Sequence, residues 1–319
     1  MLNAYCLSHK KDVDGLGSGS LAVAATGGKI ILSDYDDLVE NLKRIPDDAD
    51  RVVISDLGAD SADFPEFLAE IKRMAAHAKV TYIDHHFMSD EVRRKVEGTG
   101  VQLVHDVTEC ASILTYRTFK DVLPDRAKLL ALYGAVTDYM DDAPVAKQMM
   151  ERTERHFVLL EATMLSSALG NKSGEAGYPE KLVGELSKMK HPHEIEGVPE
   201  AAVAQLVKEA HLVDEVRAAA KTRGRLAYVV MEGYSTSIVA NVVLGTFDVL
   251  VGVAMKEKQP GFYEVSLRSV NESKVHLGQT IGKIAAQLGG SGGGHKKAAG
   301  CRIPTSRADE MIDALVKEA

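Results

Sequence analysis

The stretch Thr81-Tyr82-Ile83-Asp84-His85-His86-Phe87 decides how the rest of the chain is interpreted. Its apolar start predicts a short buried β-strand, and Asp84-His85-His86 falls where that strand should end. In open α/β sheets, ligands and chemistry gather at the carboxyl ends of the strands. A carboxylate and two imidazoles offer the oxygen and nitrogen donors that suit Mn²⁺, Zn²⁺ or Fe²⁺. For this tripeptide alone, the alternative is a hydrogen-bonded polar corner that caps the next helix.

The composition is that of an ordinary globular protein long enough for two domains, with 319 residues of which 26% are charged. The net charge of −8 argues against a protein that coats long nucleic acid non-specifically, because such binding depends on neutralising phosphates. Cys6, Cys110 and Cys301 are widely spaced, which is typical of reduced thiols in a cytoplasmic protein. The sequence shows no signal-peptide pattern and no apolar run long enough to span a bilayer, so we expect a soluble, cytoplasmic protein with no membrane partner.

Strands alternate with helices through the first part of the chain. Apolar runs predict strands at residues 3–8, 29–33, 51–55, 79–83 and 101–104, with helical segments between them. This alternation predicts an α/β fold, with a doubly wound, mostly parallel sheet in a domain of residues 1–170. Helical patterns dominate the end of that domain, including one long tract at residues 145–169.

The remaining residues divide into a connector and a second domain. Residues 171–223 have the apolar spacing of helices interrupted by turns, and we interpret them as a helical connector. Strand patterns then return at residues 226–231, 249–255 and 262–267, followed by a helix and a glycine-rich stretch. Residues 224–319 are therefore expected to form a second, smaller α/β domain.

Acidic or histidine-bearing corners follow apolar runs at four places in the first domain. They contain His9, Asp12 and Asp14; Asp56; Asp84, His85 and His86; and Asp138. Consecutive parallel strands deliver their ends to one edge of a sheet, so the four corners can converge there. Each aspartate by itself could equally cap a helix. Converging carboxylates would repel one another and are costly to bury unpaired, so divalent metal is the natural solution. Two metals about 3.5–4 Å apart form a clamp for displacement at phosphorus.

In combination, these motifs resemble those of the DHH phosphoesterases that carry a C-terminal DHHA1 domain. The resemblance rests on Asp12-Val13-Asp14-Gly15, Asp56, Asp84-His85-His86, Thr137-Asp138 and Gly292-Gly293-Gly294-His295-Lys296-Lys297-Ala298-Ala299-Gly300, so it spans both ends of the chain. The superfamily includes RecJ exonucleases, nanoRNases and cyclic-dinucleotide phosphodiesterases. The resemblance implies a phosphodiesterase with a pair of Mn²⁺ ions in each chain, with Mg²⁺ or another divalent ion as the alternative.

The resemblance also implies a role for each matching residue. Asp12 and His9 would hold one metal, Asp14, His85 and Asp138 would hold the other, and Asp56 would bridge the two. Asp84 would orient an imidazole, and His86 would face the metals or the scissile phosphate, so catalysis is assigned to His86, Asp84 and Asp56. His9 departs from the family pattern, because members with a liganding histidine place it at other offsets and RecJ-type members lack it. The alternative for His9 is a strand-end histidine bonded to the backbone.

Substrate-binding residues are expected in the second domain. Gly292, Gly293 and Gly294 can expose backbone N–H groups to a phosphate or base, and His295 adds a further donor. The alternative for this glycine-rich loop is a flexible turn. Arg268 follows a predicted strand in a Leu-Arg-Ser context that family members use to grip a substrate phosphate, and the alternative is a solvated surface arginine. His191 and His193 lie in a proline-containing turn, so we interpret them as surface residues.

Short oligonucleotides or dinucleotides are the favoured substrates. A RecJ-like single-strand exonuclease would need a basic groove lined with aromatic residues, whereas this chain has no Trp and is acidic overall. Cyclic dinucleotides and small phosphomonoesters such as phosphoadenosine phosphate stay open as alternatives. From another class, the alternative is a non-catalytic DHH-like subunit of a replication or repair assembly. Such subunits tend to lose metal ligands, whereas the aspartates are all present here. A homodimer is one assembly compatible with this sequence.

Overall fold

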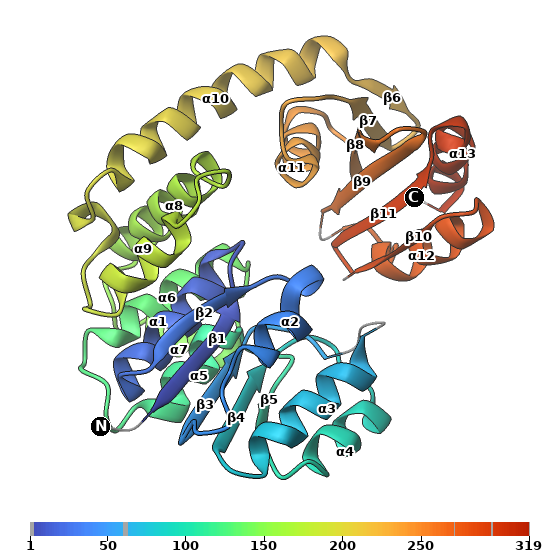
Figure 1. The fold of residues 1–319 in the computed structure, drawn as a ribbon. Helices are drawn as coiled ribbons and strands as arrows, with labels where there is room; N and C mark the ends of the chain where they lie inside the picture. Colours follow the sequence, from blue (N-terminus) through green and yellow to red (C-terminus); the bar gives the residue numbers. More distant parts are fainter. Residues whose placement is uncertain (1–2, 60–62, 271, 295, 319) are drawn as a thin grey trace. The chain divides into compact units, whose positions relative to one another are not determined.

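The computed structural model describes residues 3–59, 63–270, 272–294 and 296–318 (Figure 1). The chain falls into two units, Met1–Leu206 and Val207–Ala319, and we describe each by itself. Within the described residues, no helix combines the length and the apolar character needed to cross a membrane. All three cysteines are buried and unpaired.

The first unit contains a five-stranded sheet in which every pair of neighbouring strands is parallel. Its strands are β1 (Ala4–His9), β2 (Lys29–Ser33), β3 (Arg51–Ser55), β4 (Lys79–Asp84) and β5 (Gln102–His105), in the spatial order β2-β1-β3-β4-β5. The central strands are buried on both faces, which explains why they are continuous apolar runs and do not alternate with polar residues. The predicted α/β fold with a doubly wound parallel sheet is confirmed.

Helices cover both faces of this sheet (Figure 1). Leu114 and Ala22 of α5 (Ala111–Phe119) and α1 (Val13–Thr26) pack on one face, against Val53 and Ile83 of the strands. On the other face lie α2 (Leu38–Lys43), α3 (Phe64–Ala75) and α4 (Asp90–Glu97). A short 3-10 turn, η1 (Tyr35–Asp37), links β2 to α2.

Further helices complete the core behind α1 and α5. They are α6 (Ala127–Thr137), α7 (Pro144–Met150), α8 (Arg155–Asn171) and α9 (Tyr178–Leu186), followed by the 3-10 turn η2 (Pro192–Glu194). The single helix predicted over residues 145–169 is therefore wrong. It is divided in two because the Glu154 carboxylate accepts hydrogen bonds from the backbone N–H groups of His156 and Phe157, which starts α8 afresh.

The strand order places a reversal between β1 and β3. The connection from β1 leads to β2 on one side, whereas the later strands are added on the other side. Ligands of open α/β sheets bind in the crevice outside the carboxyl ends of the strands at such a switch point. His9 ends β1 and Asp56 directly follows β3, so two of the predicted corners lie at this point.

The second unit contains a six-stranded sheet and confirms the predicted second α/β domain. Its strands are β6 (Lys221–Arg223), β7 (Leu226–Val230), β8 (Val251–Gln259), β9 (Phe262–Ser269), β10 (Ser291–Gly294) and β11 (Ala298–Pro304), in the order β10-β11-β9-β8-β7-β6. Among the strand pairs that the structure describes in this unit, only β7 and β8 are parallel. On one face packs α11 (Thr236–Thr246), and on the other pack α12 (Leu277–Gln287) and α13 (Ala308–Glu318). The helix α10 (Val198–Ala219) spans the boundary between the units.

The glycine-rich stretch differs from the predicted loop, because Gly292 to Gly294 belong to the edge strand β10, which pairs with β11. Glycine is required there by close backbone packing: a Cβ on Gly292 would lie 2.5 Å from Cβ of Cys301, and Gly294 has a φ of 133°. No heavy atom lies within 4 Å of the Cβ position of Gly293. The strand was missed because glycine has no intrinsic preference for strands.

Candidate metal centre

The four predicted corners come together at the carboxyl edge of the first sheet. Three sets of side chains offer ligand atoms that lie within 4.8 Å of one another: His9, Asp12 and Asp56; Asp14, His85 and Asp138; and Asp56, His85 and His86. The sets share Asp56 and His85, so they form one continuous cluster. All six residues proposed as metal ligands from the sequence belong to it.

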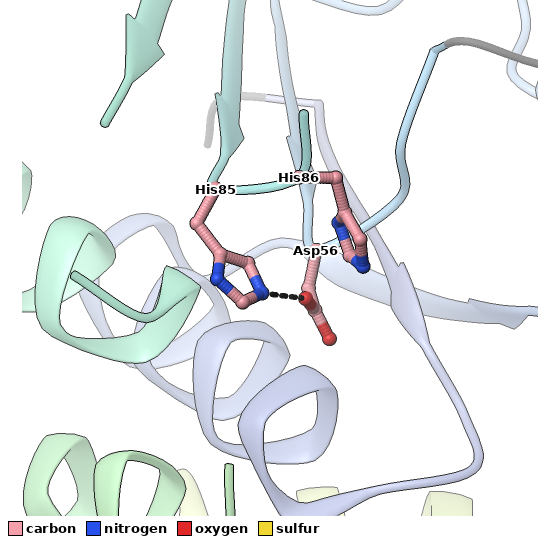
Figure 2. Close-up of side chains that lie close together, drawn as sticks. All are labelled: Asp56, His85 and His86. Atoms are coloured by element: carbon pink, nitrogen blue, oxygen red, sulfur yellow. Dashed lines mark ion pairs between the residues drawn. The ribbon is translucent and has the colours of Figure 1, made fainter. Parts of the chain in front are cut away.

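Asp56 directly follows β3, and its carboxylate lies beside the imidazole of His85, which directly follows β4 (Figure 2). Its Oδ1 is 3.3 Å from Nε2 of His85, and its Oδ2 is 3.6 Å from Nδ1 of His9. The backbone of Asp56 has a φ of 59°, a left-handed conformation in which aspartate and asparagine are tolerated better than most residues. The two oxygens of this one carboxylate therefore face different sets of ligands.

His9 is held between carboxylates on both of its ring nitrogens. Its Nδ1 is 2.7 Å from Oδ2 of Asp12, and its Nε2 is 3.6 Å from Oδ1 of Asp34. Asp34 follows β2, the neighbour of β1, and its side chain also pairs with Lys11. Metal-binding histidines commonly have a carboxylate on the second ring nitrogen, which fixes the ring orientation. His9 is thus placed among the candidate ligands, and its ring faces carboxylates.

Asp14 is anchored by the start of α5. Its two oxygens accept hydrogen bonds from the backbone N–H groups of Ala111 (2.8 Å) and Ser112 (2.9 Å). Oδ2 of Asp14 also lies 3.8 Å from Nε2 of His85, which is 3.7 Å from Oδ2 of Asp138. Gly134 of α6 makes room for this arrangement, because a Cβ there would lie 2.6 Å from Oδ1 of Asp14.

Asp84 and Tyr35 hold His86 from opposite ends of its ring. Nδ1 of His86 is 2.8 Å from Oδ1 of the fully buried Asp84, and Nε2 is 3.1 Å from the hydroxyl of Tyr35. In the neutral imidazole, Nδ1–H donates to the carboxylate, and Nε2 accepts from the Tyr35 hydroxyl. The tautomer and the orientation of His86 are therefore set by these two neighbours.

His105, at the end of β5, fixes the backbone of the same loop. Its Nδ1 lies 2.5 Å from NH2 of Arg93, and its Nε2 lies 2.7 Å from the carbonyl oxygen of His86. Arginine has no acceptor, so Nδ1 must accept and Nε2–H must donate to His86. These two contacts fix the orientation of the His105 ring.

The pKa values of the acidic side chains in the cluster are shifted in opposite directions. Burial raises the pKa of Asp14, and repulsion from Asp56 adds to the effect. Burial and repulsion from Asp14 raise the pKa of Asp138 to about 8. Burial alone would also raise the pKa of Asp56, but the imidazoles of His85 and His9 outweigh it and hold that pKa below its ordinary value.

The pKa values of two histidines in the cluster, His9 and His85, are raised. Burial lowers the pKa of His9, but hydrogen bonding to Asp12, Asp34 and Asp56 outweighs it and raises the pKa to about 12. In the same way, Asp56 and Asp14 outweigh burial and raise the pKa of His85 to about 10. The cluster therefore attracts positive charge strongly.

These residues fit a divalent metal centre by their donor chemistry. Carboxylate oxygens and imidazole nitrogens suit Mn²⁺, Zn²⁺ and Fe²⁺, and the groups that lower the Asp56 pKa are the imidazoles of His85 and His9. Asp14 and Asp56 are buried, whereas the side chains of Asp12 and Asp138 are partly exposed, so the cluster has a buried floor and an open rim. A ligand can therefore approach from solvent.

The predicted substrate residues belong to the other unit. Arg268 ends β9, where its NH1 donates to the carbonyl of Leu267 at 2.9 Å and its NH2 donates to Oγ of Ser237. Ala298 of β11 is the register partner of Arg268, and β11 also pairs with Gly292 to Gly294 of β10. His295 lies outside the described residues.

His191 and His193 are not part of the cluster. Nδ1 of His193 pairs with Glu161, and Nδ1 of His191 lies 3.2 Å from the hydroxyl of Tyr133. Both histidines take part in the packing of η2 against the helical core.

Three residues around the cluster escaped the sequence reasoning: Asp34, Tyr35 and His105. Asp34 and Tyr35 follow the apolar run of β2, so the same rule that located Asp56 could have found them. Their role depends on β2 lying beside β1, which the sequence does not reveal. His105 ends β5 and carried the same strand-end signal.

Comparisons with known proteins agree with this description. Residues 224–319 match the DHHA1 domain family. No curated protein matches the sequence. Among solved structures, the pGpG-specific phosphodiesterase PggH from Vibrio cholerae superposes with a TM-score of 0.60 at 15% identity, covering 98% of each chain.

Two other structures are similar over most of this chain. The DHH domain of a protein assigned to a family of ribosomal proteins has a TM-score of 0.71 at 19% identity, covering 99% of this chain and 86% of that one. RecJ from Thermus thermophilus in complex with Mn²⁺ has a TM-score of 0.67 at 14% identity, covering 99% of this chain. This chain spans 51% of the RecJ chain.

Proposed function

We propose that this chain is a metal-dependent phosphodiesterase of the DHH superfamily, a proposal supported by the DHHA1 match of residues 224–319 and by the similar folds of PggH and of a DHH domain. Its substrates in this proposal are dinucleotides or oligonucleotides of a few residues, and its cofactor is a pair of Mn²⁺ ions. The observation that carries the proposal is the position of Asp56, whose two oxygens face separate sets of carboxylate and imidazole donors. A carboxylate shared between two donor sets is placed to bridge two metal ions.

The ligand sets follow from that geometry. His9 and Asp12 would hold one ion, Asp14, His85 and Asp138 would hold the other, and Asp56 would bridge them. When bound, the two ions would lower the pKa of water and neutralise charge that develops on the phosphoryl oxygens.

The side chains around the ions have separate tasks. Asp84 keeps a proton on Nδ1 of His86, so that Nε2 presents a fixed lone pair towards the Tyr35 hydroxyl. The buried Asp14 is held by the start of α5, so it does not need to reorganise during the reaction. To act on the substrate phosphate, His86 would be protonated, so that Nε2–H donates to a phosphoryl oxygen in place of its contact with the Tyr35 hydroxyl. Burial lowers the pKa of His86, but the hydrogen bond to Asp84 outweighs it and raises that pKa, which favours the protonated ring.

The domains would divide binding and chemistry. We assign residues 1–170 to the metal-binding domain, residues 171–223 to the connector and residues 224–319 to the substrate-binding domain. Arg268, Gly292, Gly293, Gly294 and His295 would hold the far end of the substrate. The buried, unpaired cysteines favour a reducing compartment such as the cytoplasm.

The similarity to PggH supports the proposal of short substrates. PggH is a pGpG-specific phosphodiesterase, and the structural match covers 98% of each chain. RecJ is about twice as long, and the acidic net charge of −8 disfavours long single strands. The deciding experiment compares kcat/KM in Mn²⁺ for dinucleotides, longer single strands and cyclic dinucleotides. Higher kcat/KM on long strands would replace the proposal with a RecJ-like exonuclease. A complete lack of metal-dependent turnover on all of them would favour a non-catalytic subunit.

The substrate-binding assignment is tested by His295→Ala and Arg268→Ala. A hydrogen bond to a charged group contributes roughly 1.5–3 kcal/mol, which corresponds to about 10–150-fold in affinity. We expect each variant to raise KM for a dinucleotide by that factor and to leave bound metal unchanged. If both residues hold the same phosphate, the double variant is less than additive. Unchanged KM in both variants would remove these residues from the substrate site.

A further inference from the structure

Aromatic side chains are exposed at only three positions in the described part of the chain, and all three lie at corners of the metal centre. Tyr35 is 40% exposed, Phe87 is 71% exposed and Tyr139 is 78% exposed. Phe87 directly follows His86, and Tyr139 directly follows Asp138. Among the large hydrophobic side chains described as exposed, these last two are the most exposed.

The two rings belong to corners that meet. Nε2 of His85 lies 3.7 Å from Oδ2 of Asp138, which links the loop after β4 to the end of α6. Consecutive Cα atoms are about 3.8 Å apart, so Phe87 and Tyr139 are at most two residues along the chain from this contact. Both belong to the first unit, so their placement beside the centre depends on that unit alone.

Tyr139 also has an unfavourable backbone conformation. Its φ is 58°, in the left-handed region that glycine and asparagine adopt at less cost. A residue held in such a conformation is destabilised by about 1–3 kcal/mol, and functional sites are where such residues gather. The large ring of Tyr139 is mostly exposed, so packing within the protein does little to offset this cost. Contact with a ligand would offset it.

We propose that Phe87 and Tyr139 are stacking platforms for the nucleobases on either side of the phosphate that is cleaved. This deepens the proposed function and rests on it. Stacking of a base on an aromatic side chain contributes about 1–3 kcal/mol and tolerates any base, because every base has a π face. The platforms therefore select diesters that carry nucleobases over polyphosphates and simple sugar phosphates. Tyr35 is not included, because its hydroxyl is bonded to His86.

The test uses Phe87→Leu and Tyr139→Leu on two substrates, a dinucleotide and the same diester with both bases removed. Each variant should raise KM for the dinucleotide by about 5–150-fold, the factor that corresponds to a loss of one stacked base. The KM and kcat for the abasic diester and the bound Mn²⁺ should stay at wild-type values. Equal losses on both substrates, or no loss on either, would overturn the proposal.

Control variants separate the ring from other effects. Tyr139→Phe keeps the ring and should keep the wild-type KM. Tyr139→Asn removes the ring but adopts the left-handed backbone conformation at less cost, and it should still raise KM. Val122→Ala removes an apolar side chain that is 66% exposed in the segment between α5 and α6. It should leave KM unchanged for both the dinucleotide and the abasic diester. A KM increase in Val122→Ala as large as that in Phe87→Leu would contradict a specific role for the rings.

Binding of a dinucleotide with a non-hydrolysable linkage, measured by calorimetry on the Mn²⁺-loaded protein, separates this proposal from the proposed function. A wild-type protein that binds the analogue but cleaves no diester would overturn the phosphodiesterase assignment. Wild-type affinity in both Phe87→Leu and Tyr139→Leu would overturn the platforms while the phosphodiesterase assignment stands.

Discussion

Oδ1 of Asp56 lies 3.3 Å from Nε2 of His85, across the space between the ends of β3 and β4. The other oxygen of Asp56 turns to His9, so one carboxylate serves both donor sets. Removal of the Asp56 charge should therefore weaken metal binding at both donor sets.

Asp56→Asn is the cleanest way to remove that charge, because asparagine tolerates the left-handed backbone as well as aspartate does. We expect activity to fall by more than about 100-fold, since even loss of a group that orients a ligand lowers activity or affinity about 10–100-fold. Bound Mn²⁺, measured by elemental analysis, should fall to about one per chain or fewer. Asp47→Asn, at an exposed side chain before β3, is the control and should keep wild-type activity and wild-type bound Mn²⁺. Full metal content in Asp56→Asn would rule out the bridging role.

Metal binding should release protons in a pH-dependent way. At pH 8 the metal-free protein carries protons on His9 and His85, whose pKa values are raised to about 12 and about 10, and Asp138 with a pKa of about 8 is half protonated. Ligands must be deprotonated to bind metal, so Mn²⁺ should displace about two to three protons. The number should fall as the pH rises through about 10, because His85 is then already neutral. Calorimetry in buffers of different ionisation enthalpy measures it, and the absence of proton release at pH 8 would contradict these protonation states.

Tyr35→Phe removes the hydroxyl that contacts His86 and keeps the ring. A neutral hydrogen bond contributes about 0.5–1.5 kcal/mol, so we expect kcat to fall about 2–12-fold. Bound Mn²⁺ should not change, because the Tyr35 hydroxyl is bonded to His86 and Tyr35 is not among the proposed ligands. Asp84→Asn acts on the other ring nitrogen of His86 and should give a larger loss of kcat, since it removes a buried charge-assisted bond. A loss of metal in Tyr35→Phe would show that the hydroxyl acts elsewhere.

Gly134→Ala should destabilise the protein and lower activity. The new Cβ would lie 2.2 Å from Oγ of Ser112 and 2.6 Å from Oδ1 of Asp14, so the anchored carboxylate must shift. Overpacking of this kind lowers stability by about 1–3 kcal/mol. Gly184→Ala in α9 is the matched control, because nothing lies within 4 Å of its Cβ position, and it should raise the thermal midpoint slightly. Equal midpoints in the two variants would mean that the contact around Gly134 relaxes without cost.

The sequence predicted which strand-end side chains converge at one edge of the first sheet. Asp56 and Asp84-His85-His86 each follow an apolar run, and parallel strands must deliver such residues to one edge. Asp34 and Tyr35 also follow an apolar run, but they matter because β2 pairs with β1, and a linear pattern does not give the order of strands. The strand-end pattern therefore found the side chains that gather around Asp56 and missed Asp34, Tyr35 and His105, which contact them.

In the second domain, the sequence pattern did not predict the secondary structure of two segments. The glycine-rich stretch was expected to be a loop, yet backbone pairing with β11 makes it an edge strand. The helix α11 has a run of β-branched residues, including Val239, Val242 and Val243, which gives no clear helical signal. In both places, tertiary contacts decide the local structure against its intrinsic preference.

The position of the ligands along the chain also affects how the centre is made during synthesis. The last candidate ligand is Asp138, and the core that supports α1 and α6 is complete at Ala201. Domains generally fold as units, with the N-terminal one first as the chain leaves the ribosome. The first unit can therefore fold while the β-strands of the second unit are still being translated. If the proposed division of roles holds, a nascent chain would possess the metal site before the proposed substrate-binding domain is made.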